Sequence, residues 1–128
     1  MPKRILIVED EEDNLTVLSH ILELLLEQQD LLIARDGHEA IRMAYQHRPD
    51  IILLDLTLPN LSGWEVARSL KSDAHFRSTP LLALTAHAMV GDRERALQAG
   101  CDDYFAKPIE IDRFVAFIQP YLRSDDTV

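Results

Sequence analysis

Short apolar runs alternate along this chain with longer segments in which apolar residues recur every three or four positions. Runs of four or five such residues predict buried strands, and the periodic segments between them predict amphipathic helices. A strict alternation of strand and helix predicts an α/β fold, in which a doubly wound parallel sheet of five strands carries five helices on its two faces. The predicted strands are "ILIV" (5–8), "LLIA" (31–34), "IILL" (51–54), "LLAL" (81–84) and "DYFA" (103–106).

Polar and glycine residues mark where the predicted helices begin and end. Asp13 is the predicted N-cap of the first helix, and Asp36 turns the chain into the second. Gly100 should end the fourth helix, at 89–99, in a left-handed conformation. The third helix is predicted near 64–70 and the fifth from about residue 110, where its apolar face carries Phe114, Phe117, Ile118 and Tyr121.

Length and charge narrow the classes of protein that fit. A chain of 128 residues with 47% hydrophobic residues fits one domain, 1–128, with an ordered core of about 4–122 and a frayed tail at 123–128. There is no apolar stretch of transmembrane length and no signal peptide, so we expect a cytoplasmic protein. The net charge of −9 argues against direct binding to nucleic acid or to an anionic membrane.

The residues whose side chains could carry out chemistry stand where the predicted strands end. Glu9 and Asp10 follow the first strand, Asp55 ends the third, Thr85 ends the fourth, and Lys107 follows the fifth. The carboxyl ends of parallel strands meet at one edge of the sheet, so these three carboxylates, one hydroxyl and one amine should converge. We expect Asp55 to lie at the open edge rather than to be buried with its apolar strand.

Converging carboxylates repel one another and need a cation. A site with oxygen ligands only suits Mg²⁺, Mn²⁺ or Ca²⁺, and an open site with few carboxylates favours Mg²⁺, which also binds phosphate oxygens. Lys107 and Thr85 are suited to contact a phosphate. These groups together indicate phosphoryl transfer, with Asp55 as the carboxylate that forms an aspartyl phosphate.

Four motifs resemble those of the receiver domain of bacterial two-component response regulators. They are "ILIVEDEEDN", "DIILLDLTLPNLSGWE", "LLALTAHA" and "AGCDDYFAKPI", and the resemblance covers about residues 4–122. It implies a flavodoxin-like sheet with strand order 2-1-3-4-5. It also implies a stand-alone protein that takes a phosphoryl group from a histidine kinase or a histidine phosphotransfer protein.

The resemblance further implies a role for each site residue. Asp55 is expected to be the phosphoacceptor, and Lys107 to pair with phosphoryl oxygens. Asp10, Asp55 and the backbone carbonyl of Thr57 are expected to bind Mg²⁺, while Glu9 acts through a metal-bound water. The acidic pair Glu9-Asp10 departs from the commoner Asp-Asp.

The same resemblance implies a switch and the surface that it controls. Thr85 and Tyr104 are expected to move toward the phosphate, and Thr57 and His87 to tune its lifetime. Lys107-Pro108 is expected to be a cis peptide bond. The signalling surface would lie on the fourth helix, fifth strand and fifth helix, where either a downstream protein or a second copy, giving a homodimer, would bind. On this reading the chain is a signalling domain and no enzyme beyond its own phosphorylation and dephosphorylation.

Other readings of the same residues stay open. The chain would also fit a receiver fragment of a hybrid histidine kinase, or a pseudo-receiver that only makes protein contacts. An aspartate-nucleophile phosphatase of the haloacid-dehalogenase type would need a second carboxylate two residues after Asp55, where Thr57 stands. A flavin or nucleotide binder would need a Gly-, Ser- or Thr-rich loop after the first strand, where the sequence has "EDEED".

Overall fold

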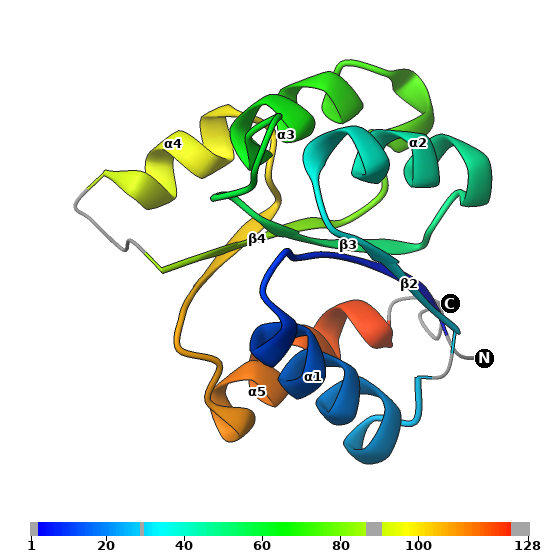
Figure 1. Ribbon diagram of the computed structural model, residues 1–128, viewed down its shortest axis with the longest axis vertical. Coiled ribbons are helices and arrows are strands. Elements are labelled where there is room, and N and C mark those ends of the chain that lie inside the picture. The colour runs from blue at the N-terminus through cyan, green and yellow to red at the C-terminus, as the bar shows by residue number, and fades with distance from the viewer. Residues whose placement is uncertain (1–2, 29, 87–90, 124–128) are drawn as a thin grey trace.

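A computed structural model describes residues 3–28, 30–86 and 91–123 of the chain. Its five strands form one parallel sheet in the order β2-β1-β3-β4-β5 (Figure 1). This arrangement confirms the predicted fold class and strand order. The strands are β1 (Arg4–Val8), β2 (Asp30–Ala34), β3 (Ile51–Asp55), β4 (Leu81–Thr85) and β5 (Asp103–Ala106).

Five α-helices cover the two faces of the sheet. Helices α2, α3 and α4 lie on one face, and α1 and α5 lie on the other (Figure 1). A π-helical turn, Ile21–Leu25, extends α1, and a 3-10 turn, Ala74–Phe76, follows α3. The α-helices are α1 (Glu12–His20), α2 (Gly37–His47), α3 (Gly63–Lys71), α4 (Asp92–Gln98) and α5 (Ile111–Leu122).

The predicted helix ends are confirmed at two places and wrong at one. The Asp36 side chain accepts a hydrogen bond from the backbone N–H of Glu39, as an N-cap should. Gly100 follows α4 with a φ of +107°. Asp13 is not the N-cap of α1, because the helix begins two residues earlier than that prediction requires, with Glu11 as its N-cap. Asp13 instead lies in the first turn, where a negative charge favours the helix dipole.

The core has two layers because successive residues of a strand point to opposite faces of the sheet. Leu6, Val8 and Leu54 pack toward α2 and α3, while the intervening Ile7 and Leu53 pack toward α1 and α5. The predicted face of α5 is confirmed, since its buried residues are Phe114 and Ile118 with Phe117 and Tyr121 packed beside them. None of the helices in the described ranges is long and apolar enough to cross a membrane.

Candidate functional site

A hollow of about 310 Å³ opens at the carboxyl edge of the sheet. The described residues that line it stand at or just after the carboxyl ends of β1, β3, β4 and β5. These four strands are far apart in the sequence. The predicted convergence at this edge is therefore confirmed for most of the residues expected there. The lining residues are Asp10, Glu11, Asp55, Thr57, Ala86 and Lys107.

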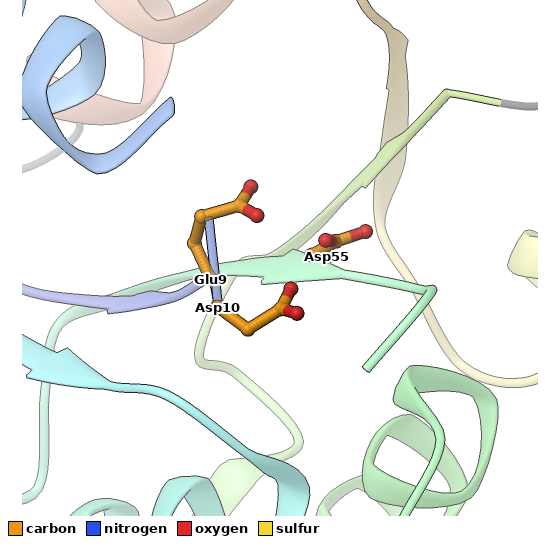
Figure 2. Close-up of side chains that lie close together, drawn as sticks. All are labelled: Glu9, Asp10 and Asp55. Carbon is orange, nitrogen blue, oxygen red and sulfur yellow. The ribbon is translucent and has the colours of Figure 1, made fainter. Parts of the chain in front are cut away.

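Three carboxylates meet at this edge. Glu9, Asp10 and Asp55 each offer one oxygen, and these oxygens lie within 4.8 Å of one another (Figure 2). Glu9 and Asp10 are brought there by the end of β1, and Asp55 is the last residue of the neighbouring strand β3. The donor set consists of oxygens alone, which fits a hard cation such as Mg²⁺.

Lys107 supplies a positive charge to this group of acids. Its Nζ lies 2.9 Å from Oε1 of Glu9 and 3.3 Å from Oδ2 of Asp55, and its side chain is 9% exposed. Its backbone N–H donates to the carbonyl of Thr85, which places the lysine against the end of β4. The bond from Lys107 to Pro108 is cis, as predicted.

Asp55 is more deeply buried than the sequence led us to expect. The residue is only 3% exposed, so the expectation that it would not be buried with its strand is wrong. It ends the central strand β3, whose residues are all buried, and Gly63, the first residue of α3, packs directly on its backbone. Asp55 nevertheless lines the hollow.

Burial governs the protonation of Asp55. It raises the pKa of the carboxyl from 3.8 to about 7, and the negative charge of Glu9 adds to the effect. The backbone N–H of Thr57, 3.0 Å from Oδ1, and the ammonium of Lys107 act in the opposite direction. A bound cation would add to these opposing effects, since it favours the ionised carboxylate.

The pKa of Lys107 is raised although its burial alone would lower it. The hydrogen bonds and negative charges of Glu9 and Asp55 raise this pKa by more than burial lowers it. The lysine is therefore held as an ammonium beside Asp55.

Two predicted site residues, Thr85 and Tyr104, do not belong to the described lining of the hollow. Thr85 is 4% exposed at the end of β4 and is not among the described residues that line the opening. Tyr104 on β5 is partly buried and packs against the core cluster on the face of the sheet that α2, α3 and α4 cover. Its hydroxyl has no hydrogen-bond partner among the described residues, and burial raises its pKa. His87 lies outside the described residues, and the metal role of the Thr57 carbonyl stays a prediction.

Sequence reasoning missed two features of this site. Glu11 lines the hollow, and the run "EDEED" contained it without indicating which of its acids face inward. Glu9 is 0% exposed, although a strand-end glutamate is ordinarily solvated. No local signal predicts that burial, because Lys107, the partner that permits it, lies 98 positions away.

Comparisons of sequence agree with this geometry. The family model for the response regulator receiver domain matches residues 5–119. The polar-differentiation response regulator DivK of Brucella anthropi is 44% identical over 122 residues, which cover 95% of this chain and 98% of that protein. DivK of Brucella ovis is 43% identical over the same length.

Solved structures give the same family. The receiver domain of the sensor histidine kinase PA1611 of Pseudomonas aeruginosa, which has a magnesium ion coordinated in its active-site cleft, superposes with a TM-score of 0.84 and 38% identity over 95% of this chain and 98% of that one. A putative response regulator from Chloroflexus aurantiacus superposes with a TM-score of 0.88 and 27% identity over the same shares. The chain therefore belongs to the family of response regulator receiver domains, the phosphoacceptor domains of two-component signalling.

Proposed function

We propose that Asp55 is the phosphoacceptor of this receiver and takes a phosphoryl group from a histidine kinase or a histidine phosphotransfer protein. The observation that carries the proposal is the position of Asp55, which lines the hollow and whose carboxylate contacts Lys107. A carboxylate oxygen of Asp55 attacks the phosphorus, the phosphorus–nitrogen bond of the donor breaks, and the donor imidazole leaves with that electron pair. The product is an acyl phosphate on Asp55.

Asp10, Asp55 and the backbone carbonyl of Thr57 would hold Mg²⁺. The oxygen-only donor set of the acidic cluster supports this assignment, as does the magnesium ion in the related receiver of PA1611. When bound, the ion would neutralise charge on the acids and on the phosphoryl oxygens. The position of Asp10 in the lining of the hollow supports its role in holding the ion.

Lys107 would contact a phosphoryl oxygen once the group is transferred. Its ammonium already lies 3.3 Å from Asp55 and needs only a short movement to follow the new negative charge. An ammonium on a flexible stem suits this role because it can turn between acceptors.

Phosphorylation would then change a protein-binding surface made of α4, β5 and α5. Thr85 would turn to the phosphate and Tyr104 would move behind it, and Thr57 and His87 would set how long the phosphate lasts. The hydroxyl of Tyr104 has no hydrogen-bond partner among the described residues and the side chain is only partly buried, which supports a side chain that can adopt a second position. A downstream protein, or a second copy in a homodimer, would bind this surface.

The chain is by this proposal a signalling domain that catalyses only its own phosphorylation and dephosphorylation. The phosphatase alternative is disfavoured because Thr57 stands where a second catalytic carboxylate would be needed. A receiver of a hybrid histidine kinase stays a second candidate, favoured by the similarity to the receiver of PA1611.

Acetyl phosphate with Mg²⁺ provides the test. Intact-protein mass spectrometry should show one added phosphoryl group on the native chain and none on Asp55→Asn. Omission of Mg²⁺ or the change Asp10→Asn should greatly slow the labelling. A native chain that gains no mass, while a control receiver is labelled in the same tube, would exclude the proposal.

A further inference from the structure

The loop of residues 56–62 joins β3 to α3 and carries Thr57. The backbone N–H of Thr57 donates to Oδ1 of Asp55 at 3.0 Å, which ties the loop to the proposed phosphoacceptor. The backbone N–H of Gly63 donates to the carbonyl of Leu56 at 3.2 Å, which brings the two ends of the loop together. These bonds join the loop to its own ends, so its position at the edge of the sheet also depends on what packs against it.

Gly37, the first residue of α2, packs against the far end of this loop. Helix α2 lies beside α3 on the same face of the sheet (Figure 1). A Cβ on Gly37 would lie 2.3 Å from the carbonyl oxygen of Leu61 and 2.7 Å from its Cβ, and no side-chain rotation moves these atoms away. Gly37 is buried and is not among the described glycines with a positive φ. The close approach to Leu61, rather than the backbone conformation, therefore requires a glycine here.

The first turn of α2 is held by hydrogen bonds that do not involve the loop. Oδ1 of Asp36 accepts from the backbone N–H of Glu39 at 2.8 Å, and Oε1 of Glu39 accepts from the backbone N–H of Arg35 at 2.7 Å. The guanidinium of Arg35 in turn donates to the carboxylate of Glu12, the first residue of α1, at 2.6 Å. The turn that contacts Leu61 is thus fixed from its other side.

We propose that Gly37 is a positioning residue for the phosphoacceptor site. By letting the first turn of α2 lie against the backbone of Leu61, it holds the loop where Thr57 stands beside the carboxylate of Asp55. The inference rests on the proposed function, because Gly37 acts on the magnesium site through Thr57. Gly37 is not among the described residues that line the hollow, so it acts without touching the ion or the phosphoryl group.

Two substitutions on α2 separate positioning from a general loss of stability. Gly37→Ala adds a methyl group against the loop, so Mg²⁺ affinity measured by isothermal titration calorimetry should fall at least about ten-fold, as when a support of a metal ligand is lost. Ala40→Gly weakens the same helix and removes a buried methyl group, but adds no atom against the loop. It should lower the midpoint of thermal unfolding and keep its Mg²⁺ affinity within about two-fold of the native value. Native affinity in Gly37→Ala, or equal losses in both variants, would overturn the inference.

The backbone amide of Thr57 gives a readout that needs neither metal nor labelling. In EDTA, its resonance in a nitrogen–proton correlation spectrum should move in Gly37→Ala and keep its native position in Ala40→Gly, because only the first change displaces the loop. An unmoved Thr57 resonance in Gly37→Ala would overturn the inference.

Asp36 allows a second test that adds no atom near the loop. Asp36→Ala removes the hydrogen bond from Glu39 that begins α2, whereas Asp36→Asn loses the same charge and still caps the helix. Asp36→Ala should bind Mg²⁺ at least about two-fold more weakly than Asp36→Asn. Equal affinities would overturn the inference, and this pair decides alone if Gly37→Ala does not fold.

The outcomes also separate this inference from the proposed function. A native chain that neither binds Mg²⁺ nor gains phosphoryl mass contradicts the proposed function. A native chain that does both, beside a Gly37→Ala variant that binds Mg²⁺ equally well, contradicts only the role given to Gly37.

Discussion

Nζ of Lys107 lies 3.3 Å from Oδ2 of Asp55, although the two residues are 52 positions apart in the sequence. The contact places one ammonium among three carboxylates, so the negative charge at this edge is only partly compensated. The effect is largest on Asp55, which is buried and whose pKa is raised to about 7. A proton or a cation is needed to neutralise the remaining negative charge.

Asp55→Asn should stabilise the metal-free protein at high pH. The folded state binds the Asp55 proton more tightly than the unfolded state, so ionisation costs native stability as pH rises from 3.8 through about 7. In EDTA, the variant should exceed the native chain at pH 8 by on the order of 2 kcal/mol in free energy of unfolding, and the gap should narrow as pH falls and close near 3.8. Urea unfolding at a series of pH values checks this, and a gap independent of pH would contradict it.

Mg²⁺ should stabilise the native chain because the ion binds the folded acids and not the unfolded chain. At a free concentration one hundred times the dissociation constant, the free energy of unfolding should rise by about 2.7 kcal/mol. Thermal unfolding with Mg²⁺ and with EDTA measures the difference. Asp10→Asn should lose most of it, while Asp13→Asn, which removes an exposed acid in the first turn of α1, should keep it. Equal losses in the two variants would indicate diffuse attraction by charge alone.

Gly63→Ala should disturb the phosphoacceptor segment. A Cβ at Gly63 would lie 2.4 Å from the carbonyl oxygen of Asp55 and 2.5 Å from Cα of Leu56, so backbone must move. We expect a loss of about 2–3 kcal/mol in stability together with slower labelling by acetyl phosphate. Gly91→Ala is the control: its Cβ meets nothing within 4 Å, and the φ of +92° alone should cost about 1–2 kcal/mol. A fully active, fully stable Gly63→Ala would contradict the packing argument.

Lys71→Met should destabilise the chain without altering the site. Its Nζ donates to the carbonyls of Phe76, Arg77 and Thr79, and lies 3.0 Å from a carboxylate oxygen of Asp102.

Loss of this cation leaves partly buried acceptors unsatisfied, so we expect about 3 kcal/mol lower stability by urea unfolding and unchanged Mg²⁺ affinity. Arg68→Met, an exposed change on the same helix, should fall within about 0.5 kcal/mol of the native chain. A matching loss in both variants would show that Lys71 has no special role.

Arg95 on α4 contacts Trp64 on α3, and Trp64 is the only tryptophan in the sequence. Its guanidinium carbon lies 4.3 Å from the ring centroid of Trp64, which is close enough for a cation–π contact. Arg95→Ala should shift the emission of Trp64 and lower stability by about 0.5–1 kcal/mol. Arg93→Ala, an exposed change on the same helix, should do neither. An unshifted emission in Arg95→Ala would show that the contact is not formed in solution.

Much of the fold could be predicted because strands and helix ends are marked by short stretches of sequence. The apolar runs gave all five strands to within a residue or two, and Asp36 and Gly100 marked helix ends through their own backbone chemistry. The N-cap of α1 was predicted wrongly because Asp13 and Glu11 stand in one acidic run, where residue type does not tell cap from first turn.

The sequence by itself determined the order of strands and helices and the kinds of groups at the sheet edge, because hydrophobic period and residue identity are properties of short segments. Only the tertiary structure decided how those groups share their charge. It buried Asp55 beside the hollow, enclosed Glu9 with Lys107 and left Asp10 exposed. The physical reason is that solvent exclusion and ion pairing depend on distances between segments up to 98 positions apart, which no local pattern encodes.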